Sequence, residues 1–208
     1  MDKLASSLKR RDEAPNVKLA ESIVLKNDKK AIADLVGNLA NKDRQIQSDC
    51  IKVLYEIGER KPKLIAQFAE EFSSLLDNKN NRLAWGAMTA LDSVALEAPA
   101  KTRRMLPRII EAANRGSVIS RDHAVSILTK LTSRKEYADQ VMPLLVNQLR
   151  HSPSNQLPMY AENAINVITE KNRDLFLRTL RSRLGDIQKE SKRMRVEKVI
   201  AKLSLPSP

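Results

Sequence analysis

Cysteine, glycine and aromatic residues are scarce in this chain of 208 residues. It contains one cysteine, Cys50, five glycines and 3% aromatic residues. A single cysteine cannot form an intramolecular disulfide, and a chain with so few glycines offers few hairpin turns. Leucine, alanine, isoleucine, lysine, arginine and glutamate dominate instead, and most of these residues favour helices. The composition therefore predicts an all-α protein.

Long apolar runs are missing as well. The sequence has neither the 18 consecutive apolar residues that a membrane-spanning helix needs nor an apolar leader segment near its beginning. Its apolar residues, 42% of the total, are spread along the chain and suffice for a buried core. We therefore expect a protein without a membrane span, located in the cytoplasm.

The motifs of common enzymes and metalloproteins are absent too. His123 and His151 lie on different segments, and neither has a second histidine, a cysteine or a paired carboxylate at ligand spacing. The sequence contains no glycine-rich phosphate loop, no GxSxG turn and no HExxH helix. We expect no catalytic residue, no metal site and no small-molecule cofactor.

A repeated pattern organises what is present. A small residue is followed, three and four positions later, by two apolar residues, which is the spacing of one helix face. The last apolar residues of successive copies are 37, 37, 40 and 32 residues apart. A fainter copy precedes them at Ala20. The five clear copies are Cys50 with Val53-Leu54, Ala87 with Ala90-Leu91, Ala124 with Ile127-Leu128, Ala164 with Val167-Ile168, and Val196 with Val199-Ile200.

Each copy follows a second apolar series at helical spacing, so each unit is predicted to be a pair of helices joined by a polar turn. Pro62 and Pro99 mark unit boundaries, where proline can open a helix without losing a needed N–H group. A repeat of this length built from helix pairs predicts a single α-solenoid domain over 1–208. Its expected units are approximately 1–28, 29–61, 62–98, 99–134, 135–172 and 173–205.

The units resemble HEAT repeats. The matching features are Met105-Leu106-Pro107 and Val141-Met142-Pro143 in two first helices, and Ser120-Arg121 before Ala124 and Ile127-Leu128 in one second helix. The resemblance covers nearly the whole chain. It implies a right-handed α-solenoid of about five HEAT-like helix pairs plus a short N-terminal pair, with the second helices along a concave groove. It implies no particular ligand.

Helix geometry selects candidate groove residues around the single tryptophan. The apolar stripe of its helix faces the core, so Trp85 is expected on the opposite, partly exposed face. An exposed aromatic side chain on a rigid helix is a common binding anchor. The alternative is that it packs beneath the preceding turn. Equivalent positions give the groove candidates Tyr55, Trp85, Thr89, Asp92 and Asp122.

Basic residues are concentrated at the end of the chain. The formal net charge is +12, and residues 171–208 contribute +7 of it through 11 Lys/Arg and 4 Asp/Glu. Such a charge favours acidic partners. We call this region the basic cap, and its candidate contacts are Lys192, Arg193, Arg195 and Lys198. The structural alternative is a solvated helix face.

We therefore expect a non-enzymatic scaffold that binds an acidic protein or peptide in its groove. Non-specific nucleic-acid binding through the basic cap is the first alternative. The second is an alkylpurine DNA glycosylase with a HEAT-like fold, to which Trp85, Asp92 and Tyr55 give a faint resemblance. The chain departs from that family because Thr89 stands where an aspartate one turn from the tryptophan is expected, and because no second tryptophan exists.

Overall fold

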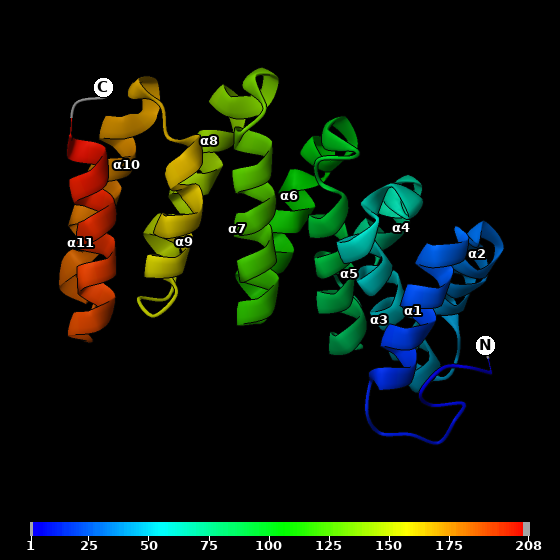
Figure 1. Cartoon of the computed structure of the whole chain (residues 1–208). Coiled ribbons are helices and arrows are strands. Elements are labelled where there is room, and N and C mark those ends of the chain that lie inside the picture. Colours follow the sequence, from blue (N-terminus) through cyan, green and yellow to red (C-terminus); the bar gives the residue numbers. More distant parts are fainter. Residues whose placement is uncertain (1, 206–208) are drawn as a thin grey trace. The chain divides into compact units, whose positions relative to one another are not determined.

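Helices make up the regular structure of this protein. The computed structural model describes residues 2–205, and within that range it contains eleven α-helices, five short 3-10 helices and no strand (Figure 1). The predicted all-α class is confirmed.

The chain divides into two compact units, one up to Ala124 and one from Val125 onward, with the division inside α7. The first unit contains α1 (Ala14–Lys26), α2 (Lys29–Gly37), α3 (Arg44–Arg60), α4 (Ala69–Ser74), α5 (Asn81–Val94), α6 (Pro99–Arg115) and the beginning of α7 (Val118–Thr132), with 3-10 turns at Asn38–Ala40, Pro62–Leu64 and Ala66–Phe68. The second contains the rest of α7, α8 (Lys135–His151), α9 (Leu157–Ala164), α10 (Glu170–Arg183) and α11 (Glu190–Ser204), with 3-10 turns at Ile165–Val167 and Leu184–Asp186.

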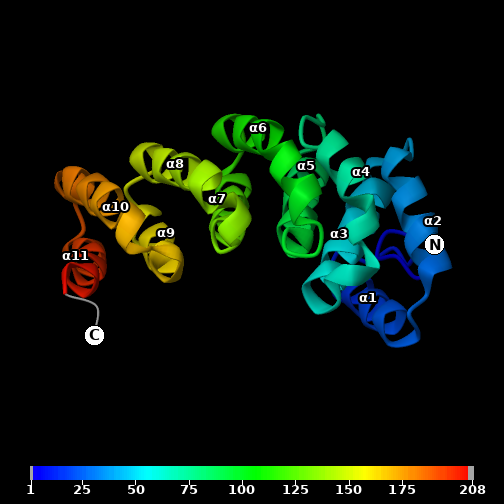
Figure 2. The same ribbon diagram turned by 90° about the horizontal axis from the view of Figure 1, so that it is seen from above.

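Within each unit the helices pack as layers. In the first unit, α3 lies between α1 and α5, while α4 packs against both α5 and α6. In the second unit, α8 contacts α10 and α9 contacts α11, so that α8 and α10 form one layer and α9 and α11 the other (Figure 2). Each unit is therefore a helical-repeat-like arrangement of packed helix pairs.

The small residues of the repeat lie where helices approach closely. Cys50, Ala87, Ala124 and Ala164 are all fully buried, as the repeat predicts. A neighbouring glycine shows how little space the first unit leaves: a Cβ atom on Gly86 of α5 would lie 2.9 Å from Cγ1 of Ile51 in α3. Small side chains at these positions allow the backbones of adjacent helices to come together.

Two expected helix positions differ from the observed ones. The range 1–28, expected to hold a short helix pair, contains the single helix α1, and residues 2–13 form turns before it. Lys9 lies in the left-handed region at φ 56°, which interrupts a helix, and Pro15 stands at the start of α1. Helix α10 begins at Glu170, ahead of the expected boundary at 173, because Thr169 and Asn172 form a capping box.

Candidate binding site

Trp85 lies in a cleft of the first unit. Its side chain is half-buried on α5, and its ring centroid is 6.3 Å from that of Tyr55, with 44° between the ring planes. These two groove candidates, from adjacent helices, therefore lie close together. Trp85, Leu76 and Ile119 contribute to the lining of a cleft of about 480 Å³. The tryptophan is therefore partly accessible, as expected, although its cleft opens beside the loop that precedes α5.

Three other groove candidates are buried, which corrects the expectation of an exposed row. Tyr55, Thr89 and Asp92 are only 7%, 7% and 8% exposed. The Thr89 hydroxyl donates to the Trp85 carbonyl oxygen at 3.0 Å, and Asp92 Oδ2 lies 2.8 Å from His123 Nδ1. The expectation assumed one buried stripe per helix. Helix α5 is covered on more sides, since it packs against both α3 and α4 and Asp92 meets α7.

Asp122, the remaining groove candidate, is half-buried on α7. On α3, Lys52, one turn from Tyr55, belongs to an ion-pair network. Lys52 Nζ lies 2.7 Å from Glu56 and 3.2 Å from Glu13, and it stands 4.6 Å from the centre of the Tyr55 ring. Burial raises the pKa of Tyr55, an effect that the hydrogen bond with Lys52 opposes.

A second and more basic cleft lies at the beginnings of α3 and α5. It has a volume of about 620 Å³, and we call it the basic cleft. The turn segment before α1 forms one wall, and Ser48 and Asn80 contribute polar groups from the helix ends. Its charged lining comprises Lys9, Arg10, Arg11, Arg44 and Arg82 on the positive side and Asp12, Glu13 and Asp49 on the negative side.

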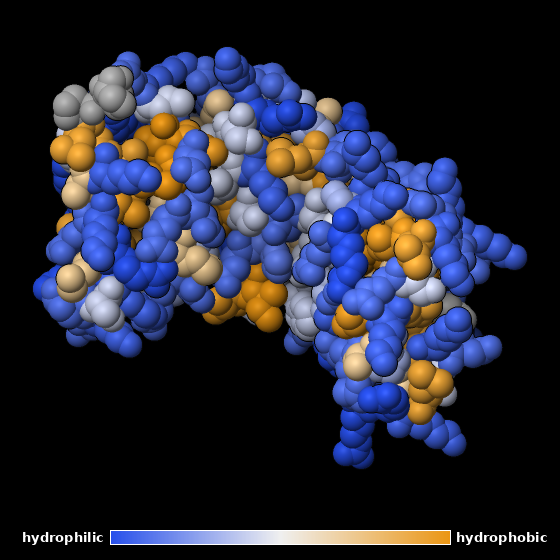
Figure 3. Space-filling view, in the orientation of Figure 1, coloured by the Kyte–Doolittle hydropathy of each residue, from blue (hydrophilic) through white to orange (hydrophobic). Residues whose placement is uncertain are grey.

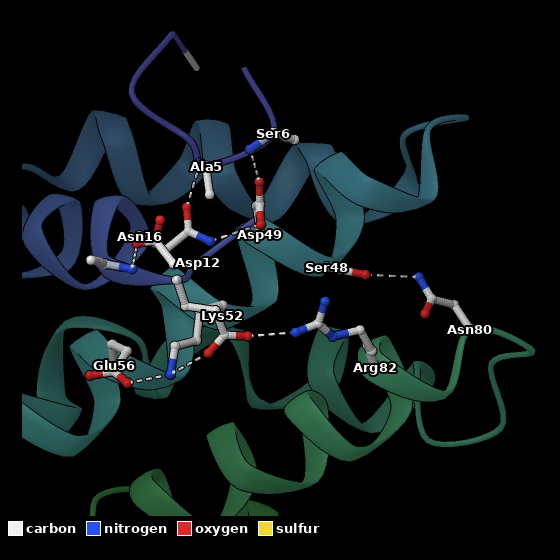
Figure 4. A network of polar contacts seen from close by, with 12 residues as sticks. Ala5, Ser6, Asp12, Asn16, Ser48, Asp49, Lys52, Glu56, Asn80 and Arg82 are labelled. Carbon is white, nitrogen blue, oxygen red and sulfur yellow. Dashed lines mark hydrogen bonds and ion pairs between the residues drawn. The ribbon is translucent and has the colours of Figure 1, made fainter. Parts of the chain in front are cut away.

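Hydrogen bonds hold the wall of the basic cleft in place (Figure 4). The Asn16 side chain accepts from the Ala5 backbone N–H at 2.9 Å and donates to Asp49 Oδ1 at 2.8 Å. Asp49 Oδ2 accepts from the Ser6 backbone N–H at 2.7 Å. These bonds join the turn segment to α1 and α3; Asn16 is fully buried and Asp49 is half-buried.

The carboxylates of the basic cleft already have partners. Asp12 accepts from Arg10 Nε at 2.8 Å, and this hydrogen bond lowers the pKa of Asp12. Glu13 accepts from Arg82 at 2.6 Å and pairs with Lys52. Asp49 accepts hydrogen bonds from Ser6 and Asn16 in the wall.

Three cations of the basic cleft lack ion-pair partners in the range 2–205, and its lining of five cations and three carboxylates has a net charge of +2. Lys9, Arg11 and Arg44 are exposed and make no ion pair among the residues that the structure describes. The cleft therefore carries uncompensated positive charge.

Most of the basic cap is engaged within the second unit. Arg195 binds Glu162 through two contacts, Nε–Oε1 at 2.7 Å and Nη2–Oε2 at 2.5 Å, and this hydrogen bonding raises the pKa of Arg195. Arg193 pairs with Glu190 and, at 3.8 Å, with Glu197.

The two lysines of the cap differ from each other. Lys192 Nζ donates to Asn155 Oδ1 at 3.1 Å and is half-buried. Lys198 is exposed and has no ion pair within the described range 2–205. Of the four cap candidates, Lys192 and Lys198 thus have no ion-pair partner in the described range, although Lys192 is held by Asn155.

The basic cleft was missed by the sequence-based reasoning, which followed equivalent helix positions. A signal was present in the consecutive cations Lys9-Arg10-Arg11. Nothing in the sequence pattern, however, placed them beside Arg44 and Arg82.

Clusters for metal binding are not found in residues 2–205. No cluster of three or more His, Cys, Asp or Glu side chains there could hold a metal ion. Cys50 is a buried free thiol, and burial raises its pKa to about 12, which keeps it protonated at neutral pH. No helix in this range is both long and apolar enough to cross a membrane.

Comparisons with known proteins support the fold alone. No protein-family model matches the chain, and no curated protein matches it. The structure is similar to that of an engineered protein whose crystal structure comes from the Northeast Structural Genomics Consortium, with a TM-score of 0.66, 18% sequence identity and 98% of each chain covered. At this identity the likeness says nothing of a ligand.

Proposed function

We propose that this chain is a non-enzymatic scaffold of HEAT-like repeats, forming a right-handed α-solenoid in the cytoplasm, and that it binds an acidic segment of a partner protein. The binding site in this proposal is the basic cleft. The observation that carries it is the excess of cations there: Lys9, Arg11 and Arg44 are exposed and lack ion-pair partners in the described residues, whereas Asp12, Glu13 and Asp49 are all engaged.

The chemistry of the basic cleft suits carboxylates. An arginine guanidinium can donate two parallel hydrogen bonds to one carboxylate, and such charge-assisted bonds are about twice as strong as neutral ones. Arg44 is the first residue of α3, so it stands where the helix dipole also favours negative charge. The hydrogen bonds to Ala5 and Ser6 hold the backbone of the turn segment that carries Lys9 and Arg11, which lowers the entropy lost on association.

The proposal is tested by titrating the protein with a fluorescein-labelled peptide rich in glutamate and following fluorescence anisotropy. The double variant Arg11→Ser/Arg44→Ser is expected to bind about tenfold more weakly, because it loses two charge-assisted contacts. Rising salt should weaken wild-type binding, since the Debye length falls from about 10 Å at 0.1 M to about 3 Å at 1 M.

A matched control removes the same charge elsewhere. Lys29 and Lys63 are exposed in the first unit and do not line the basic cleft. The variant Lys29→Ser/Lys63→Ser lowers the net charge by the same amount and should keep nearly wild-type affinity. Equal weakening in both double variants would show that the peptide responds to net charge alone, and the basic cleft would then not be its site.

Nucleic acid is the alternative partner, through the basic cap. It has less support, because Arg193 and Arg195 are paired with carboxylates and must leave them to contact phosphates. Titration with labelled duplex DNA on the same protein compares the two. Tighter binding to the duplex than to the acidic peptide, with a salt slope that Lys198→Ser reduces by about one, would favour nucleic acid.

The glycosylase alternative also has little support. Asp92 is engaged with His123, and Thr89 is buried with its hydroxyl on a backbone carbonyl. Neither side chain offers an accessible carboxylate beside Trp85. Release of methylated purines from alkylated DNA at catalytic protein concentrations would overturn the assignment of a non-enzymatic role.

A further inference from the structure

An apolar cleft lies beside α1, and its charged lining is positive only. Its volume is about 360 Å³. Leu8, Pro15 and Leu19 provide apolar surface, while Lys3, Arg10 and Lys18 are the charged residues around them, with no aspartate or glutamate in the lining. We call it the leucine cleft.

The leucine cleft exposes apolar surface that a partner would cover. Leu8 is 50% exposed and is among the few large apolar side chains that reach solvent this far. The face of the first unit drawn in Figure 3 is largely hydrophilic, with small hydrophobic areas between polar ones. Apolar surface gathered in a cleft and ringed by charge is typical of an interaction site, since leaving it in water costs free energy.

Arg10 joins the leucine cleft to the basic cleft, because its side chain lines both. One bound segment can therefore extend from one cleft into the other. The two clefts demand different chemistry from it: carboxylates near Lys9 and Arg11, and apolar side chains near Leu8 and Leu19.

We propose that the partner segment is both acidic and apolar, so that its leucine-like side chains fill the leucine cleft while its carboxylates meet the cations of the two clefts. This inference rests on the proposed function and specifies the partner further. Charge complementarity determines the occupant, since Lys3 and Lys18 would repel a basic apolar segment, whereas Arg10 is already paired with Asp12. A peptide is favoured over an anionic membrane, because Pro15 is buried and Leu19 is half-buried within the cleft, whereas a lipid surface binds side chains that protrude.

The test uses three fluorescein-labelled peptides of equal length. The first has leucines spaced among glutamates, the second has serines in place of the leucines, and the third has glutamines in place of the glutamates. The wild-type protein is expected to bind the first peptide at least tenfold more tightly than the second, because burying a leucine side chain is worth a factor of that size. It should also bind the first more tightly than the third.

Two variants compare the loss of a leucine inside the leucine cleft with the loss of a leucine outside it. Leu8→Ser removes apolar surface inside the cleft, and Leu25→Ser removes an 83% exposed leucine of α1 that does not line it. Leu8→Ser should weaken the first peptide about threefold to tenfold and leave the second peptide unchanged. Leu25→Ser should affect neither. Both leucines are at least half exposed, so neither change should prevent folding, and thermal unfolding checks this.

The outcomes distinguish this inference from the proposed function. Equal binding of the first two peptides, with loss of both in Arg11→Ser/Arg44→Ser, would overturn the inference and leave the proposed function standing. Binding of the third peptide as tight as the first, unaffected by the arginine changes, would overturn the proposed function and the inference with it. Leu8-dependent sedimentation with phosphatidylserine vesicles, without peptide binding, would overturn the inference in favour of a membrane partner.

Discussion

Asn16 is the residue on which the geometry of the basic cleft depends most. It is fully buried and bonds both to the Ala5 backbone and to Asp49. Because Asp49 in turn accepts from the Ser6 backbone, one asparagine and one aspartate fix the segment that carries Lys9 and Arg11. A polar side chain buried in this way has a structural role with a direct effect on the site.

Replacing Asn16 by alanine is expected to lower the free energy of unfolding by about 1–3 kcal/mol, since the Ala5 N–H group and Asp49 each lose a partner. The turn segment should also become more susceptible to trypsin at Lys9 and Arg10. Denaturant unfolding and limited proteolysis measure both effects. Asn147→Ala is the control, because Asn147 is exposed on α8 and alanine favours a helix there. Unchanged stability and cleavage in Asn16→Ala would contradict the role of Asn16 in holding the turn segment in place.

Trp85 provides a fluorescent probe of its own cleft. Because it is half-buried and is the only tryptophan, its emission should lie between those of a buried and a fully exposed indole. Acrylamide should quench it, although less efficiently than it quenches free tryptophan. A strongly blue-shifted emission that acrylamide does not quench would show that the cleft is closed in solution.

At the level of elements, the contact between α3 and α5 depends on the absence of a side chain at Gly86. An added Cβ atom would lie 2.9 Å from Cγ1 and 3.0 Å from Cγ2 of Ile51, and Ile51 is itself only 1% exposed. At Gly37, in the last turn of α2, an added Cβ would have no neighbour within 4 Å. The same substitution should therefore act in opposite directions at these two glycines.

Gly86→Ala is expected to destabilise the protein, because overpacking costs about 1–3 kcal/mol and exceeds the gain of about 1 kcal/mol in helix propensity. Gly37→Ala should stabilise it by about 0.4–1 kcal/mol, since the backbone is already helical and the unfolded chain loses freedom. Chemical denaturation of both variants measures the change in the free energy of unfolding and its sign. A stabilised Gly86→Ala variant would contradict the close approach of α3 and α5.

The ion pairs on α3 give stability a dependence on pH. Burial alone would raise the pKa of Glu56, but its hydrogen bonds with Lys52 and Arg60 outweigh burial and hold that pKa below the ordinary value of 4.5. A carboxylate with a lowered pKa stabilises the fold above its unfolded pKa, and this contribution is lost as the pH falls through the folded pKa.

Glu56→Gln should therefore be less stable than wild type at pH 7, and the difference should shrink as the pH falls below about 4.5. Urea unfolding at several pH values measures it. The control is Glu197→Gln on α11, an exposed partner of Arg193 at 3.8 Å, for which a change of only about 0–1 kcal/mol is expected. A difference between Glu56→Gln and wild type that stays constant with pH would mean that the ion pairs do not contribute.

For the whole molecule, the net charge of +12 and the local cations of the basic cleft should act on different rate constants. Long-range attraction mainly raises the association rate, whereas direct contacts slow dissociation. Lys29→Ser/Lys63→Ser should therefore lower the association rate of the acidic peptide only slightly and leave its dissociation rate unchanged, so that the affinity stays near that of the wild type. Arg11→Ser/Arg44→Ser should raise the dissociation rate several-fold. Stopped-flow anisotropy at low salt resolves both, and equal dissociation rates in the two variants would contradict specific contacts in the basic cleft.

The sequence by itself determined the helical class and the positions of most helices. Helical periodicity depends on residues three and four apart, so the repeat at Cys50, Ala87, Ala124 and Ala164 could be found by its spacing, and all four positions are buried. Proline and capping residues are equally local signals. The exposure of Trp85 and its proximity to Tyr55 followed from the same periodicity combined with the repeat.

Only the tertiary structure decided which charges remain available. Arg195 is neutralised by Glu162, 33 positions earlier in the chain, and Arg82 reaches Glu13 across 69 positions. Periodicity carries no information about such pairs, because they depend on which helices become neighbours and on the reach of long side chains. Packing between distant segments also buries Thr89 and Asp92 and assembles the basic cleft from a turn and two helix ends. Such packing decides which side chains are buried and which stay exposed, and the sequence pattern does not distinguish between them.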